Sequence, residues 1–368
     1  MKLLLFSDLH LDTHFRWAGP DAARVRRRNL RSTLSKIVSL ARGLEVDALC
    51  CGGDLYENER FAPDTGEFLR ATFEALAPLP LFIAPGNHDW FGPASLYHQV
   101  NWSENVRVFT DGAFVPVEIA DGFTLWGAGH RAPANTPDLL RGFRVDRGGV
   151  NVALFHGSEG TGFSWQGEGK VAHAPFGAEE ILRAGFVHAL LGHYHRPTDG
   201  PTHTYPGNPD PLEFGEDGDR GAVLLTFHHD GTVDRARHQV ATSVVEGVTV
   251  DVDGVSHTDQ ARDVVRQVLA TRRGFVRLDL VGEISPDVDL EPSEFTTAAV
   301  APHLDALVLR FDKVRPAYDF ETLSCEPTVR GQFVRDVMAS SDLGDDERRR
   351  VLVTGLRALA GHDDLAVR

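Results

Sequence analysis

Short apolar runs recur along the first 240 residues, and most of them end in a cluster of glycines or polar residues. Continuous apolar runs of this length are typical of strands in a sheet that is covered on both faces. We predict strands at residues 3–6, 46–51, 80–83, 106–109, 115–119, 123–126, 150–155 and 186–191. Two further strands at 222–227 and 233–240 are joined near Asp230-Gly231, which predicts a hairpin.

Helical periodicity separates the first strands. Leu30, Leu34 and Ile37 recur at helical spacing within residues 21–42, and a second helix is expected at about 64–77. The order strand, helix, strand, helix, strand predicts a parallel unit with right-handed crossovers. In such α/β sheets a site forms beyond the carboxyl ends of the strands.

The pattern changes after about residue 242. Strand-like runs at 247–252, 275–281 and 306–311 accompany a helix at about 257–272. Two amphipathic helices follow near 328–339 and 345–360, and we expect their apolar stripes to pack onto the chain itself rather than onto a partner. We therefore expect a main domain at 1–241, a smaller α+β capping domain at 242–322 and a helical tail at 323–368.

Composition narrows the class of protein. The chain has 368 residues, 42% of them hydrophobic and 24% charged, as in ordinary soluble globular proteins. No apolar run approaches the ~20 residues that a membrane helix requires, and the apolar N-terminus is interpreted as a strand rather than a signal peptide. Of three cysteines, Cys50 and Cys51 are adjacent, so we expect buried thiols and a reducing cytoplasm.

The net charge of −16 argues against a protein that binds DNA over a broad basic surface. Any contact with nucleic acid would have to use a local patch, metal ions or a partner. A basic run lies on the first predicted helix: Arg24, Arg26, Arg27, Arg28 and Arg31. A solvated helix face is the favoured interpretation of this run over contact with phosphate.

Residues with metal-binding or acid–base chemistry gather where the predicted strands end. They are Asp8, His10, Asp54, Asn87, His88, Asp89, His156, His193 and His195. Asp8 and His10 are two residues apart, as are His193 and His195, so each pair projects from one side of an extended chain. Each stretch alone could be a capped turn with a satisfied histidine. Their recurrence at five strand ends favours a single site.

This inventory suffices for two metal ions that share one carboxylate, with one histidine left over. Oxygen and nitrogen donors without thiolate fit manganese, iron or zinc, and ligand type does not decide between them. A two-metal site suits hydrolysis of a phosphate ester. His88 is the natural spare group for proton donation, and Asp89 is a possible partner that orients its ring.

The order Asp-x-His, Gly-Gly-Asp, Gly-Asn-His-Asp, His-Gly and Gly-His-x-His resembles that of the calcineurin-like metallophosphoesterase superfamily over residues 1 to about 240. The resemblance implies an α/β fold, a four-layer α/β/β/α sandwich. It places a first metal on Asp8, His10, Asp54 and His195, and a second on Asp54, Asn87, His156 and His193. Asp54 would bridge the two ions, and His88 would be catalytic.

Within that superfamily the chain resembles the SbcD-type DNA repair exonucleases. The matching stretches are residues 7–11, 85–89, 192–197, 205–209 and 214–216, although Glu57 stands where that family usually has Asp. The resemblance implies a manganese-dependent nuclease that acts on DNA ends. It also implies an SbcC-like SMC-type ATPase as partner and a possible homodimer.

Two other functions remain open. One is a phosphodiesterase or phosphatase for small molecules, which the acidic charge favours. The other is a metal-bound scaffold that recruits a partner through its C-terminal part. A Gly-rich loop at 158–177, which contains Trp165 and His173, is expected to face the substrate because of its length. The remaining histidines considered are expected to be structural or exposed: His14, His98, His130, His173 and His203.

Overall fold

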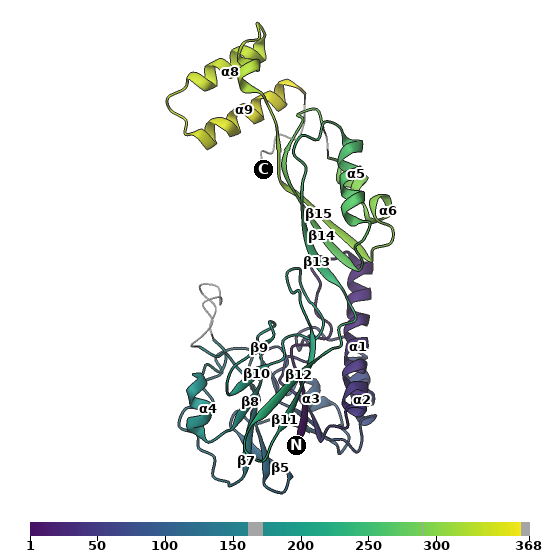
Figure 1. Cartoon of the computed structure of the whole chain (residues 1–368), viewed down its shortest axis with the longest axis vertical. Coiled ribbons are helices and arrows are strands. Elements are labelled where there is room, and N and C mark those ends of the chain that lie inside the picture. Colours follow the sequence, from purple (N-terminus) through teal and green to yellow (C-terminus); the bar gives the residue numbers. More distant parts are fainter. Residues whose placement is uncertain (161–171, 289, 362–368) are drawn as a thin grey trace. The chain divides into compact units, whose positions relative to one another are not determined.

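The structure is a computed structural model that describes residues 1–160, 172–288 and 290–361 (Figure 1). Trp165 of the predicted substrate-facing loop therefore lies outside the described residues. The chain divides into two compact units, Met1–Val245 and Glu246–Arg368. The three-part division with boundaries after residues 241 and 322 stays a prediction.

One six-stranded sheet of the first unit has the order β12-β11-β1-β2-β3-β4. β1, β2, β3 and β4 are parallel to one another, whereas β11 runs antiparallel to both β1 and β12. The predicted parallel unit and the predicted hairpin are thus confirmed. The strands are β1 (Lys2–Phe6), β2 (Ala48–Cys51), β3 (Leu81–Ile83), β4 (Val106–Val108), β11 (Gly221–Phe227) and β12 (Val233–Gln239).

The second sheet of this unit also has six strands, in the order β5-β6-β7-β8-β10-β9. β6, β7, β8 and β10 are parallel to one another, and β5 and β9 are antiparallel edge strands. Their bounds are β5 (Val115–Ala120), β6 (Phe123–Gly127), β7 (Val150–His156), β8 (His188–Gly192), β9 (Thr198–Asp199) and β10 (His203–Tyr205). The two short strands β9 and β10 are not among the predicted elements.

The described part of the first unit contains four helices: α1 (Pro20–Gly43), α2 (Thr65–Glu74), α3 (Leu96–Gln99) and α4 (Ala178–Ala184). Successive residues of a strand point to opposite faces, so each sheet serves two cores. Leu4 packs in the core that α1 and α2 share with the first sheet, whereas Leu5 packs against Leu125 between the two sheets. Ile181 of α4 packs with Phe155 on the outer face of the second sheet. The predicted four-layer α/β/β/α sandwich is therefore confirmed.

The basic run on α1 differs from the predicted solvated face at one position. Arg26 is fully buried, and its guanidinium lies 2.8 Å from the Oδ1 atom of Asp210. The second oxygen of Asp210 accepts hydrogen bonds from the Thr33 hydroxyl at 2.9 Å and from the backbone N–H groups of Thr242 and Ser243 at 2.6 and 3.0 Å. A buried charge needs such a counter-charge, because desolvation without one is costly.

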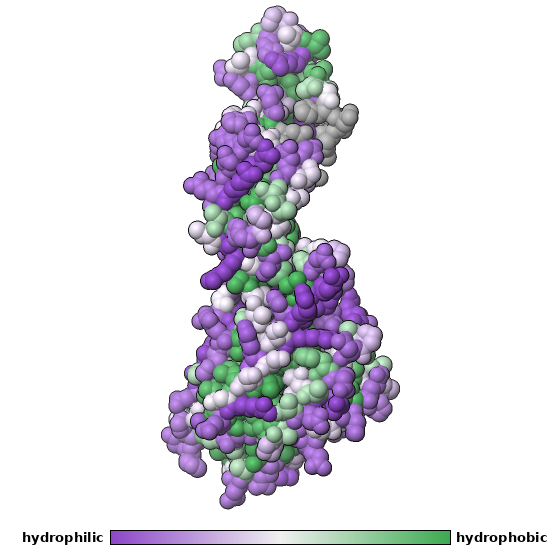
Figure 2. All heavy atoms as spheres, turned by 90° about the vertical axis from the view of Figure 1, so that its right-hand side faces the viewer, coloured by the Kyte–Doolittle hydropathy of each residue, from purple (hydrophilic) through white to green (hydrophobic). Residues whose placement is uncertain are grey.

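The surface of α1 is otherwise polar. Arg24 pairs with Asp21 at 3.1 Å, and Arg31 pairs with Asp64 at 2.7 Å. Figure 2 looks onto the side of the molecule that carries α1 and shows hydrophilic residues around smaller apolar groups. The arginines of these two exposed pairs are thus already engaged with carboxylates.

The second unit contains a three-stranded sheet in the order β13-β14-β15, with β14 and β15 parallel. Val265 and Leu269 of α5 pack on this sheet in a core of their own. α8 and α9 lie close together (Figure 1), and Val334, Leu352 and Leu356 form the core between them. The elements are β13 (Val245–Asp251), α5 (Thr258–Leu269), β14 (Phe275–Ile284), a 3₁₀ turn η1 (Pro292–Phe295), α6 (Thr297–Val300), β15 (Ala306–Pro316), α7 (Phe320–Ser324), α8 (Val329–Ala339) and α9 (Asp345–Leu359).

Part of the apolar surface of the last helices stays exposed. Val329 is 76% exposed and Leu359 is 50% exposed, although both belong to the stripes expected to pack onto the chain. Among the described helices, none combines the length and the apolar character needed to cross a membrane.

Candidate metal centre

All predicted site residues lie at the carboxyl ends of parallel strands. Asp8 and His10 follow β1, Asp54 follows β2, and the segment 87–89 follows β3. In the second sheet His156 is the last residue of β7, and residues 193 and 195 come directly after β8. The carboxyl ends of β1, β2 and β3 meet those of β7 and β8, which brings the two groups of side chains together.

Two glycines allow this close approach. A Cβ atom at Gly53 would lie 2.7 Å from the backbone nitrogen of Gly86 and 2.7 Å from the Nδ1 atom of His156. A Cβ atom at Gly86 would collide with a carboxylate oxygen of Asp54. A residue with a side chain at either position would therefore push the loops after β2 and β3 away from β7.

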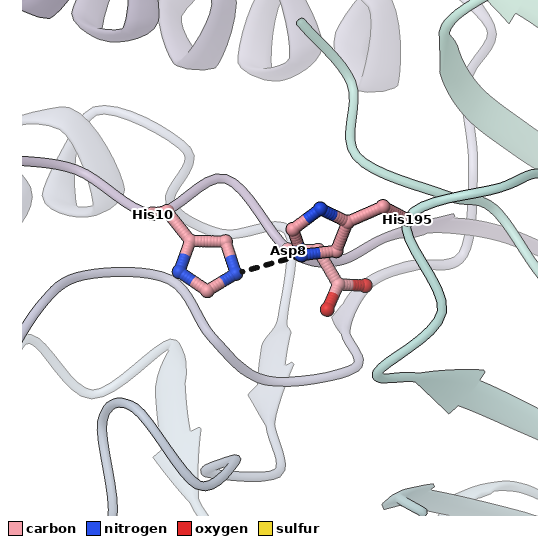
Figure 3. Close-up of side chains that lie close together, drawn as sticks. All are labelled: Asp8, His10 and His195. Carbon is pink, nitrogen blue, oxygen red and sulfur yellow. Dashed lines mark hydrogen bonds between the residues drawn. The ribbon is translucent and has the colours of Figure 1, made fainter. Parts of the chain in front are cut away.

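The first half-site is formed by Asp8, His10 and His195, whose potential ligand atoms lie within 4.8 Å of one another (Figure 3). The Nε2 atoms of the two imidazoles face each other at 3.2 Å. Both rings are held from behind, because the Nδ1 atom of His10 is 2.8 Å from Glu57 and that of His195 is 2.8 Å from Glu216. Donation from Nδ1 leaves each Nε2 lone pair free for a metal ion.

The second half-site centres on His156, which is fully buried. Its Nε2 atom lies 3.1 Å from the amide oxygen of Asn87 and 3.2 Å from the Nδ1 atom of His193. Its own Nδ1–H donates to the backbone oxygen of Gly52 at 2.9 Å. Because Nδ1–H is engaged with Gly52, Nε2 is the nitrogen of His156 that would bind a metal ion once it has given up its proton.

Asp54 lies between the two half-sites. Its Oδ2 atom is 3.6 Å from the Nε2 atom of His10 and 3.3 Å from that of His156. Its Oδ1 atom accepts the backbone N–H of His88 at 2.8 Å. Burial would raise the pKa of Asp54, but the two neighbouring imidazoles hold it well below its usual range. An ionised carboxylate in this position is suited to bridge two cations.

The donor set fits divalent metal ions. Imidazole nitrogens, carboxylate oxygens and one amide oxygen converge on the centre, and these are the ligands that manganese, iron or zinc accept. Cys50 and Cys51 are buried in the strand behind, where burial raises the pKa of both thiols. The individual ligand assignments and the identity of the metal stay predictions.

The backbone at the centre is strained. Asp8, His10, Asp54 and His193 have positive φ angles of 53°, 48°, 51° and 115°. Residues with a side chain rarely adopt such angles, and each costs of order 1–3 kcal/mol. The surrounding fold therefore holds the donor groups in conformations that the local chain would not choose.

Asp89 does not orient the ring of His88 as expected, because Glu57 holds that position. Both oxygens of Asp89 accept other donors, among them the N–H groups of Gly86 at 2.6 Å and Leu55 at 2.7 Å. The Nδ1 atom of His88 lies instead 3.1 Å from Glu57. Asp89 is fully buried and joins the loops after β2 and β3, so its place is structural rather than beside the His88 ring.

Sequence reasoning missed the two carboxylates that orient histidines. In the sequence Glu57 stands out only as a departure from a family pattern, and Glu216 only as part of a matching motif. Burial would raise the pKa of Glu216, yet its bond to His195 lowers that pKa to about 2. A carboxylate shortly after a predicted ligand loop would have been a signal, but spacing alone does not show which histidine it reaches.

The other five histidines considered differ in how far they are buried. His14 and His98 are exposed, as expected. His130 and His203 are buried. His173 is half-buried, and its ring lies 5.4 Å from that of His193.

Fold and donor set together define a phosphoesterase domain with a candidate centre for divalent metals. The sequence model of calcineurin-like phosphoesterases matches residues 1–197, more than half of the 368 residues. The chain therefore belongs to the calcineurin-like phosphoesterase family.

Two relatives extend this comparison. The uncharacterized metallophosphoesterase YhaO of Bacillus subtilis is 26% identical over 236 residues, which are 60% of this chain and 55% of that protein's length. The DNA double-strand break repair protein Mre11 of Haloferax volcanii is 26% identical over 361 residues, which are 93% of this chain and 73% of that protein. The crystal structure of TT1561 of Thermus thermophilus is 15% identical with a TM-score of 0.35, and covers 64% of this chain and 98% of its own.

Proposed function

We propose that the protein is a two-metal phosphodiester hydrolase that acts on DNA ends as a repair nuclease. The observation that carries this proposal is the length of the match to the archaeal DNA double-strand break repair protein. That match covers 93% of the chain and so continues beyond the 245 residues of the phosphoesterase unit into the second unit. The motif resemblance to the SbcD-type nucleases supports the same substrate.

Each residue of the centre has a role in this reaction. Asp8, His10, Asp54 and His195 would hold one ion, and Asp54, Asn87, His156 and His193 the other. When bound, two such ions activate water and stabilise the charge that develops on the phosphoryl oxygens. We assign manganese to the site, with iron or zinc as the alternatives that the donor set also accepts.

His88 is the proposed proton donor. Its side chain is 45% exposed at the edge of the first half-site, so an incoming substrate can reach it. Burial lowers the pKa of His88, but the hydrogen bond to Glu57 and the charge of Asp54 outweigh burial and raise it to about 9. The oxygen of a water molecule bonds to phosphorus while one of its protons passes to solvent, the ester P–O bond breaks, and the proton of His88 goes to the leaving oxygen.

The test compares a DNA duplex with a small phosphodiester. Wild-type protein, His88→Ala and the control His229→Ala, which removes an exposed histidine of the β11–β12 turn, are incubated with Mn²⁺ and an end-labelled duplex. Hydrolysis of bis(4-nitrophenyl) phosphate is measured in parallel. We expect shortening of the duplex by wild type and control, and a loss of at least about 100-fold in His88→Ala. A duplex that stays intact both with and without the SMC-type ATPase of the same source, while the small substrate is cleaved, would contradict the DNA proposal.

A small-molecule phosphodiesterase is the second candidate. The net charge of −16 favours it, as do the carboxylates that engage Arg24 and Arg31 on α1. Without a broad basic surface, DNA binding would depend on the metal ions or on another subunit.

We further propose an SMC-type ATPase as partner, as the SbcD resemblance implies, with a homodimer as the assembled form. The exposed apolar residues Val329 and Leu359 of the last helices are consistent with a protein contact. Light scattering of the purified chain, alone and mixed with the SMC-type ATPase of its own source, tests both proposals. Monomeric mass in both samples would contradict them.

A further inference from the structure

Four imidazoles form a closed ring around the second half-site. The ring centroids of His156 and His193 are 5.1 Å apart, and those of His193 and His173 are 5.4 Å apart. His130 closes the circle at 6.2 Å from His173 and 5.4 Å from His156. His156 and His193 are predicted ligands, whereas His130 and His173 have no assigned part in the chemistry, although His173 belongs to the loop expected to face the substrate.

His130 has no capacity left for a ligand or a substrate. It is fully buried, and its Nε2–H donates to the backbone oxygen of His156 at 2.8 Å. Its Nδ1 atom accepts the hydroxyl of Thr136 at 2.9 Å. Both nitrogens are thus used within the fold, and His130 supports the end of β7.

His173 differs from His130 both in its burial and in the hydrogen bonds of its ring. Its ring is half-buried rather than buried, and its Nδ1 atom has no hydrogen-bond partner among the residues that the structure describes. Buried polar atoms without a partner are rare in folded proteins and call for an explanation. Because this Nδ1 atom is itself buried, a substrate would have to meet the other nitrogen of the half-buried ring, Nε2.

The position of the His173 ring is set by its backbone. Its N–H donates to the Ser158 hydroxyl at 3.2 Å, and its carbonyl accepts the N–H of Ser158 at 2.9 Å. A Cβ atom at Gly157 would lie 2.7 Å from the carbonyl oxygen of Ala174, so the two segments are in close contact. His173 is therefore fixed to the chain that directly follows the predicted ligand His156.

A ligand role for His173 is not favoured. The second half-site already has four predicted protein donors. His173 also mirrors His88, which is half-exposed beside the first half-site with its ring 4.7 Å from that of His10.

We propose that His173 is a further catalytic residue, whose imidazole N–H donates a hydrogen bond to a phosphoryl oxygen of the substrate at the second half-site. The inference rests on the phosphoester hydrolysis in the proposed function, and it holds for DNA and for a small phosphodiester alike. No proton is transferred in this role. The bond strengthens as negative charge grows on the phosphoryl oxygens, and this selectively stabilises the transition state.

The test uses full-length protein loaded with Mn²⁺, in the variants His173→Ala and His173→Gln, with His229→Ala as control. Glutamine keeps an N–H donor at similar reach but has no ring. Titration calorimetry gives the number of Mn²⁺ ions bound and the affinity for inorganic phosphate, and hydrolysis of bis(4-nitrophenyl) phosphate gives kcat and KM.

We expect His173→Ala to bind the same number of Mn²⁺ ions and to bind phosphate about 10-fold more weakly. Its kcat/KM should fall roughly 10–100-fold, mainly through kcat, with partial recovery in His173→Gln. Unchanged phosphate affinity in His173→Ala would overturn the proposal, and so would the loss of one Mn²⁺ ion, which would make His173 a ligand.

The proposal that the substrate is DNA and the proposal for His173 can be refuted independently of each other. Cleavage of the small substrate without digestion of DNA, even with the SMC-type ATPase present, would refute the DNA proposal and leave the kinetic test of His173 intact. If neither substrate is cleaved, the phosphate affinity of the variants alone decides the role of His173.

Discussion

The side chain of Glu57 contacts both a predicted metal ligand, His10, and the proposed proton donor, His88. Its Oε1 atom lies 2.8 Å from the Nδ1 atom of His10, and its Oε2 atom lies 3.1 Å from that of His88. Burial would raise the pKa of Glu57, but the hydrogen bonds from both histidines lower it to about 2. One carboxylate thus orients a predicted metal ligand and keeps the predicted proton donor charged.

Replacement of Glu57 by glutamine should shift the pH dependence of the reaction. His88 acts as a donor only when it is protonated, and activity is lost as the pH rises through its pKa. Without the negative charge of Glu57 the pKa of His88 falls, so the alkaline limb of kcat moves to lower pH. We expect kcat at about pH 8 to drop about 10-fold or more. A pH–rate profile with bis(4-nitrophenyl) phosphate measures both effects.

Glu59→Gln is the matched control, because Glu59 is exposed two residues further along the same loop. It should leave the profile unchanged. An alkaline limb at the same pH in Glu57→Gln and wild type would show that His88 is not the donor or that Glu57 does not set its pKa.

At the scale of elements, Asp89 joins the loops after β2 and β3. It accepts the N–H groups of Asp54 at 3.1 Å, Leu55 at 2.7 Å and Gly86 at 2.6 Å, and the hydroxyl of Tyr97 at 2.6 Å. Burial, followed by the charge of Asp54, raises the pKa of Asp89 to about 6. The hydrogen bonds from Tyr97, Leu55 and Gly86 act in the opposite direction and lower the pKa of Asp89, because they stabilise its charged carboxylate.

We expect Asp89→Asn to destabilise the protein by roughly 2–4 kcal/mol, because one end of the amide can only donate and would face N–H groups that also donate. Tyr97→Phe removes a single bond and should cost about 1 kcal/mol. Urea unfolding in the presence of EDTA measures both without a contribution from metal binding. Equal midpoints for Asp89→Asn and wild type would refute this structural role.

The strands could be predicted because apolar runs and the residues that end them are local signals. β1, β2, β3 and β7 were found in this way, and with them the donors at their ends. β9 and β10 were missed because two or three residues carry too little pattern.

The burial of Arg26 could not be predicted for another reason: its partner Asp210 is 184 positions away in the sequence. The same holds for Glu57 and His173, whose neighbours only the folded chain defines.

At the scale of the whole molecule, every donor of the centre belongs to the first unit. The predicted ligands extend from Asp8 to His195, and the most distant orienting carboxylate is Glu216, all within Met1–Val245. The second unit has its own core around Val265, Val276 and Leu278. Metal binding and the proposed processing of DNA should therefore be separable.

A fragment of residues 1–245 should fold and bind the same number of Mn²⁺ ions as the full chain. Its kcat/KM for bis(4-nitrophenyl) phosphate should stay within about threefold of the full-length value, since the residues that touch the substrate are unchanged. Digestion of duplex DNA should fall by a larger factor if the second unit serves the nucleic acid. Loss of one or both metal ions from a folded fragment would contradict the assignment of the centre to the first unit.

The buried pair of Arg26 and Asp210 also constrains how this sequence can change over generations. Loss of either partner alone leaves an uncompensated charge and costs about 3–5 kcal/mol, a large part of the roughly 5–15 kcal/mol by which a domain is typically stable. A protein that has lost only one of the two residues would therefore be strongly destabilised, and selection would tend to remove it. In descendants of a common ancestor, positions 26 and 210 should be inherited as a unit, both charged or both replaced.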